Sequence, residues 1–293
     1  MKKGTLVSEK VFDLFVHLIL LALVVVTLYP MLYVAFASVS DATALVSHKG
    51  IIWKPLGFSL ASYESVFKNP SIMIGYSNTL FILFFGVTIN LFLTALGAYV
   101  LSRKNVMWNN VFIAIIVFTM VFQGGLIPLY LVVKGVGLVD SLWATIIPFA
   151  INTFNLIIMR TAFQAVPDSL EESAKIDGAN HFTILFRIVL PLSMPVIAVM
   201  ILYYAVEKWN GWFWASVFLK NRDLFPLQLI LREILIANST DSMSAGASAG
   251  DQFQIGETIK YATIMVASVP ILILYPFVQK YFVKGVMIGA LKG

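Results

Sequence analysis

The sequence predicts an all-α polytopic membrane protein, from its composition and from the length of its apolar runs. Of the 293 residues, 59% are hydrophobic and 12% are charged, and the mean hydropathy is +0.89. Soluble globular domains contain about 45–50% apolar and about 25% charged residues, so this chain has too little polar surface for a soluble particle. Cysteine is absent. This absence excludes disulfide frameworks, thiol catalysis and cysteine-ligated metal sites.

Six apolar runs are predicted to cross the membrane as helices within a single transmembrane domain, residues 1–293. A helix needs about 20 apolar residues to cross a hydrocarbon core of about 30 Å. The runs are continuously apolar over more than twice the length of a barrel strand, which favours helices. None has Asp, Glu, Lys or Arg in its central part. The predicted spans are approximately 14–37, 77–101, 111–133, 141–159, 185–206 and 260–279.

The first run has an alternative interpretation as a cleaved secretory signal. Lys2 and Lys3 precede it, and Ala35-Phe36-Ala37 has the form of an A-x-A cleavage site. The apolar region of a signal peptide covers only about 7–15 residues, and this run is longer. A retained membrane helix is therefore favoured.

The distribution of basic residues predicts that both termini lie in the cytoplasm. With six spans the termini share one side, together with the loops after the second and fourth spans. That side holds 11 basic and six acidic residues, a net charge of +5, whereas the opposite side is neutral. Cytoplasmic loops carry the excess of Lys and Arg in membrane proteins. The external side then carries the loops 39–73 and 209–259.

The spans lack the groups that most carriers and enzymes need. The span interiors contain no Asp, Glu or His except His17, which lies close to the cytoplasmic end of the first span and is most simply a helix-end residue near the headgroups. His48 and His181 lie far from it in the sequence, so no metal site and no catalytic residue is predicted. The chain has no GxSxG, HExxH or GxxxxGK[ST] motif. Uphill transport by this chain would need energy from a partner, although sodium coupling through backbone carbonyls stays open.

The predicted cytoplasmic loop 166–184 has the features of a short surface helix over 168–178. Pro167 sets a helical φ at its start. Asp168 and Ser169 each precede a glutamate by three residues, which gives two alternative capping boxes. Gly178 can turn the chain at the end. A solvated loop between spans is the alternative interpretation.

A motif in this loop resembles a family signature. Glu172-Ser173-Ala174, three residues, Gly178, nine residues, Ile188, one residue and Leu190-Pro191 resemble the EAA-x3-G-x9-I-x-LP motif of ATP-binding cassette (ABC) importer permeases. Ser173 replaces the middle alanine with another small residue. The resemblance implies the type I importer permease (MetI-like) fold, in which 168–178 is the cytoplasmic coupling helix.

The resemblance extends over nearly the whole chain to carbohydrate-type permeases similar to the smaller permease subunit of the maltose system. It looks closest to the subgroup labelled LplC-like or YtcP-like. The stretches that carry it are Gly124-Gly125-Leu126-Ile127-Pro128, Ile176-Asp177-Gly178-Ala179, Leu190-Pro191-Leu192-Ser193-Met194-Pro195 and the tail Gly285-Val286-Met287-Ile288-Gly289-Ala290-Leu291-Lys292-Gly293.

This resemblance implies a non-catalytic subunit that forms half of a carbohydrate import pathway, with an oligosaccharide as the expected substrate, in a bacterial cytoplasmic membrane. The implied partners are a second homologous permease subunit, two ATPase subunits that bind ATP and Mg, and an extracytoplasmic solute-binding protein. No cofactor is expected in this chain, and no nucleic acid. Three alternatives remain: an ABC permease for a non-sugar solute, a secondary carrier, and an integral-membrane enzyme.

Candidate site residues form two groups. By resemblance, the residues that couple to the ATPase are Glu171, Glu172, Ser173, Ala174, Asp177 and Gly178. Polar groups are costly in lipid and therefore face protein or water, so they are candidates for the substrate pathway. These candidates are Asn78, Asn90, Gln123, Asn152, Asn155, Trp209 and Asn210. Interhelical hydrogen bonding is the alternative role of the amides, and an interfacial aromatic belt that of the tryptophan.

Two further segments have open roles. The small-residue stretch 239–250 is predicted to be flexible, and it either docks the solute-binding protein or only connects two spans. The tail 284–293 is similar to the family's tail that reaches the ATPase interface, and simple anchoring is its alternative role.

Overall fold

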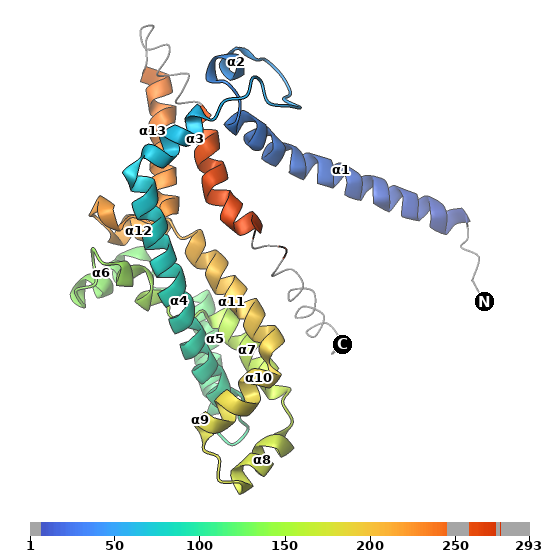
Figure 1. The fold of residues 1–293 in the computed structure, drawn as a ribbon. Coiled ribbons are helices and arrows are strands. Elements are labelled where there is room, and N and C mark those ends of the chain that lie inside the picture. Colours follow the sequence, from blue (N-terminus) through green and yellow to red (C-terminus); the bar gives the residue numbers. More distant parts are fainter. Residues whose placement is uncertain (1–6, 245–257, 274–275, 277–293) are drawn as a thin grey trace. The chain divides into compact units, whose positions relative to one another are not determined.

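The computed structural model describes residues 7–244, 258–273 and 276, and this part of the chain is mostly helical, without a strand (Figure 1). The chain divides into two compact units. One consists of Met1–Asn69 with Glu233–Val269, and the other of Pro70–Arg232 with Pro270–Gly293.

The first unit contains the first predicted span as one uninterrupted helix, α1 (Val7–Ser38). None of the residues in its most apolar window is buried within the chain. The following loop contains two short helices, α2 (Ala42–Ser47) and α3 (Ala61–Lys68). The described residues of the sixth predicted span, apart from residue 276, lie in a helix over Thr258–Ile273. The rest of that predicted span lies outside the described residues.

The second unit is built around α4 (Pro70–Ser102), which packs along α7 (Thr153–Gln164) and α11 (Met194–Trp209). The buried residues of α4 recur every three or four positions, as one face of a helix requires. From its start they are Ile72, Gly75, Thr79, Ile82, Gly86, Asn90 and Thr94. A continuous predicted span is therefore confirmed here as well.

Each of three other predicted spans consists of helices that meet at a sharp bend. The third consists of α5 (Asn109–Val121) and α6 (Leu126–Gly135), at 112° to each other. The fourth bends by 49° before α7, and the fifth by 87° before α11. The short helices before these two bends are η1 (Leu142–Thr145), η2 (Ile147–Phe149), α9 (His181–Ile184), the π-helix η3 (Leu185–Val189) and α10 (Leu190–Leu192).

Glycine or proline lies at or near each break. Two glycines separate α5 from α6, Pro148 lies in η2, and Pro191 and Pro195 flank the break at Ser193. Proline has no N–H to donate and its ring displaces the carbonyl four residues earlier. The apolar composition of these runs predicts that they lie in the membrane. It does not predict where their helices bend.

The predicted external loop 209–259 is largely helical. It contains α12 (Phe213–Phe218), η4 (Arg222–Leu224) and α13 (Leu227–Ser244). The stretch predicted as flexible therefore begins inside α13, and its residues 245–250 lie outside the described part, as does the tail 284–293.

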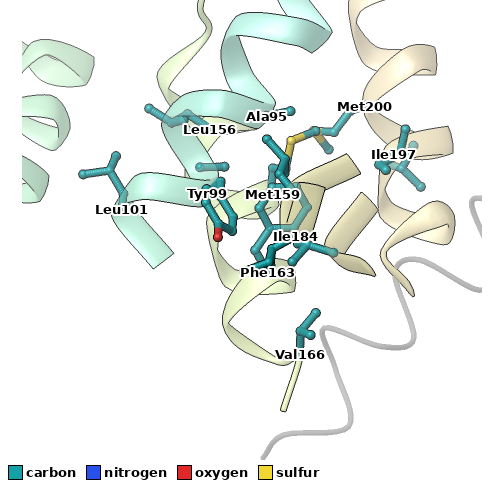
Figure 2. Packing of buried hydrophobic residues seen from close by; sticks show 14 residues of the cluster. Ala95, Tyr99, Leu101, Leu156, Met159, Phe163, Val166, Ile184, Ile197 and Met200 are labelled. Carbon is teal, nitrogen blue, oxygen red and sulfur yellow. The ribbon is translucent and has the colours of Figure 1, made fainter. Parts of the chain in front are cut away.

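The main hydrophobic core of the second unit joins α4, α7, α9, η3 and α11 (Figure 2). Tyr99, Met159, Phe163, Ile184 and Met200 are among its buried side chains. This core holds the loop between α7 and α9 against the end of α4.

Gly75 allows α4 to approach the first turn of α13. A methyl group at this position would lie 2.6 Å from Ile230 Cδ1 and 3.1 Å from the Leu227 Cα. We expect Gly75→Ala to lower the midpoint of thermal unfolding in detergent, since overpacking costs about 1–3 kcal/mol. This exceeds the gain of about 1 kcal/mol that alanine brings to a helix. Gly135→Ala is the matched control, because nothing lies within 4 Å of its added methyl group. Equal midpoints for the two variants would contradict the close approach.

Candidate functional site

The helix α8 (Asp168–Ile176) lies in the predicted coupling loop, beyond the end of α4 near α9 and α10 (Figure 1). It follows Pro167, whose φ of −59° suits a helix start, and no side chain caps its N-terminus. The two predicted capping boxes are therefore wrong. The carboxylate of Asp168 instead accepts a hydrogen bond from Lys104 Nζ at 2.7 Å. This bond lowers the pKa of the Asp168 carboxyl.

The predicted turn at Gly178 is confirmed. Gly178 has a φ of +82°, which costs glycine nothing, and its N–H donates to Lys175 O at 3.0 Å. The N–H of Ala179 donates to Ala174 O at 2.9 Å. Together the two bonds form a Schellman motif, which ends α8 and satisfies two of its last carbonyls.

One face of α8 is attached to its own chain. Glu171 is buried and forms an ion pair with Arg103, which follows α4 directly. Ala174, one turn later, is half-buried against the main core. Burial lowers the pKa of the Arg103 guanidinium, yet arginine stays charged in proteins. The pair therefore places two opposite charges where little water reaches them.

The opposite face of α8 is exposed. Ser169, Glu172, Ser173 and Ile176 follow the i, i+3, i+4, i+7 spacing of one helix face, and all four are exposed. Ile176 is 86% exposed, an isolated apolar side chain among polar ones. Of the predicted coupling residues, only Glu171 is buried, and Ala174 is half-buried. The exposed ones are Glu172, Ser173, Asp177 and Gly178.

Three predicted pathway residues make local or interhelical hydrogen bonds. Asn78 Nδ2 donates to Asp223 O at 2.8 Å and to Phe225 O at 3.1 Å. Asn152 Oδ1 caps α7, accepting from the backbone N–H groups of Phe154 and Asn155. Asn210 Nδ2 donates to Val206 O within its own helix end.

The other predicted pathway residues differ in their burial and contacts. Asn90 is fully buried in α4, and neither atom of its amide has a hydrogen-bond partner among the described residues. Asn155 is buried in α7, whereas Gln123 is exposed at the break between α5 and α6. Trp209 is buried and meets Tyr76 edge to face, with ring centroids 6.4 Å apart.

Sequence reasoning missed two residues of α11 that hold the break before α7. The Tyr204 hydroxyl accepts from the backbone N–H of Asn152 at 3.3 Å and lies 2.6 Å from Thr94 Oγ1 of α4. One turn later, Lys208 Nζ donates to Thr145 O at 3.3 Å. The signal for Lys208 is weak, because it lies just beyond the predicted span and is easily assigned to a loop.

We expect Tyr204→Phe to lower the free energy of unfolding by about 1 kcal/mol, because hydrogen bonds between membrane helices contribute about 0.6 kcal/mol and up to about 1.7. Denaturant unfolding in detergent measures this change in the free energy of unfolding. Tyr130→Phe is the control, since its ring stacks on Phe218 and its hydroxyl has no bond within the described residues. Equal losses in both variants would count against the role of the Tyr204 hydroxyl.

Comparisons with known proteins agree with this architecture. Residues 9–288 match the family described as binding-protein-dependent transport system inner membrane component. The polygalacturonan/rhamnogalacturonan transport system permease protein YtcP of Bacillus subtilis (strain 168) is 42% identical, over 98% of this chain and all of its own. Protein LplC of the same bacterium is 41% identical, over 98% of this chain and 96% of its own.

A solved structure gives the same result for the fold. A chain of a bacterial ABC transporter involved in the import of the acidic polysaccharide alginate superposes with a TM-score of 0.87 at 32% identity. The match covers 96% of this chain and all of that one. The predicted all-α, MetI-like permease fold is thereby confirmed, and the family is a transport component rather than an enzyme. The chain belongs to the binding-protein-dependent transport system inner membrane components, the permeases of ABC importers.

Proposed function

We propose that this chain is the permease subunit of an ATP-driven importer of carbohydrate, with an oligosaccharide as substrate, and forms half of the translocation pathway. The match over residues 9–288 covers both compact units and supports a single permease domain. YtcP is named for the transport of polygalacturonan and rhamnogalacturonan, and the solved transporter for the import of the acidic polysaccharide alginate, whereas less similar relatives are named for arabinooligosaccharides or for melibiose, raffinose and stachyose. The names of the two more similar proteins favour an acidic oligosaccharide. Import of a non-sugar solute is the second candidate, since the loop motif carries no information about the substrate.

The observation that carries the proposal is that α8 has one buried face and one exposed face. Its inner face is anchored to the chain, and its outer face presents Ile176 and Glu172 to solvent. An apolar side chain beside an acid suits a groove with a hydrophobic floor and a basic rim. We assign this groove to an ATPase subunit, which binds the ATP and Mg for which this chain has no phosphate loop.

The arrangement along α4 supports the proposed topology. The segments assigned to the cytoplasm meet at the end of α4, where Lys104 pairs with Asp168. Segments assigned to the exterior meet near its beginning, where Asn78 bonds to Asp223 O. The excess of basic residues supports an orientation in which the α8 end and both termini lie in the cytoplasm. The second permease subunit and a solute-binding protein complete the proposed assembly.

We expect Glu172→Lys to lower ATP-dependent uptake at least about tenfold, which corresponds to about 1.4 kcal/mol of lost coupling. The physical reason is that the reversed charge faces a partner built for an acid. The measurement is sugar uptake into proteoliposomes that contain the whole complex, with co-purification of the ATPase subunits as a second readout.

Glu64→Lys is the control for this variant. Glu64 is also an exposed helix glutamate, but it lies on α3, in a loop assigned to the exterior. We expect the Glu64→Lys variant to keep uptake within about twofold of the wild type, a difference under about 0.4 kcal/mol. Uptake that persists in Glu172→Lys would refute the role of α8, and uptake without ATP would identify a secondary carrier.

A further inference from the structure

Two ion pairs attach α8 to the residues that follow α4, and they differ in their environment. Arg103 and Glu171 have side chains that are 11% and 6% exposed, whereas Lys104 and Asp168 are 85% and 60% exposed. An exposed pair of long side chains is screened by water and holds its partners loosely. A buried pair resists separation strongly, because either charge left alone would stay in a medium of low polarity.

Arg103 contacts a third element in addition to α4 and α8. Its Nη2 donates to Phe163 O, in the last turn of α7, at 3.3 Å. Its Nε donates to Ser102 Oγ at 3.0 Å, and the guanidinium lies 4.8 Å from the centre of the Tyr99 ring. Because the guanidinium is planar and rigid, these contacts fix its direction. Within the described part of the chain, the Lys104 side chain bonds to α8 alone.

Further hydrogen bonds hold the end of α4 to its neighbours. Arg160 Nε of α7 donates to Leu101 O at 2.8 Å. Asn109 Nδ2, at the start of α5, donates to Leu101 O and to Arg103 O, both at 3.1 Å. A displacement of this end of α4 therefore carries α7 and α5 with it.

We propose that Arg103 and Glu171 are positioning residues for coupling, and that movement of α8 reaches α4 and α7 through this buried pair. The inference rests on the proposed function. In this proposal two adjacent glutamates have different roles. Glu172 faces the ATPase, and Glu171 holds α8 to its own chain. The exposed pair of Lys104 and Asp168 has no such task.

The first test compares Glu171→Gln with Asp168→Asn in the whole complex in proteoliposomes. Both variants remove one acid from α8 without changing its size. We expect Glu171→Gln to lower the uptake per ATP hydrolysed at least about fivefold while the ATPase subunits still co-purify, and Asp168→Asn to change it less than about twofold. Equal ratios in the two variants would overturn the inference.

The second test has a readout in the chain with Glu171 and Arg103 unchanged. The chain has no cysteine, so spin labels can be attached at Lys175→Cys on α8 and Val100→Cys on α4, both exposed positions. We expect one narrow distance distribution, unchanged between the nucleotide-free and the ATP-trapped complex and broadened by Glu171→Gln. A distance that changes with nucleotide in the otherwise wild-type chain would overturn the inference. The proposed function would fail separately, through normal uptake by Glu172→Lys.

Discussion

The second unit depends on partners for the backbone groups that its broken spans release. A hydrocarbon core contains no water, so every freed N–H and C=O must find a partner in the protein or line a wet cavity. At the break before α7 these partners come from α11, through Tyr204 and Lys208, and from the cap made by Asn152. Because Tyr204 also bonds Thr94, the break is tied to α4. The main helices of the unit are thus held together where their own hydrogen bonding stops.

Composition predicted the membrane class and the approximate position of the spans, because burial in lipid requires long apolar runs whether the helices are straight or bent. It could not predict the breaks. Pro30 lies inside the unbroken α1, whereas Pro191 and Pro195 flank a bend of 87°. Proline in a membrane helix is tolerated wherever neighbours satisfy the freed groups. Whether a proline bends a span is therefore decided by tertiary contacts that the local sequence does not contain.

The candidate site was predictable to a similar degree. The motif located α8, and Gly178 ended it as expected, because a left-handed residue and a Schellman motif are local features. The capping boxes failed for a long-range reason, since Asp168 and Glu171 bond to cations near the end of α4 instead. The pathway amides were ambiguous for the same reason. An isolated asparagine in a span costs the same whether it bonds a helix or lines a channel, and only the structure distinguishes Asn78 from Asn90.

The two faces of α8 suit two different mechanical requirements. A contact with a separate subunit that changes conformation in each cycle must form and release readily, and exposed charges with a single apolar side chain give a contact of modest strength. An attachment within the chain must not release at all. A buried ion pair meets that need, because separating its partners would leave an uncompensated charge in a medium of low polarity. The burial of Glu171 beside the exposure of Glu172 is the arrangement that the proposed coupling role requires of the two faces of α8.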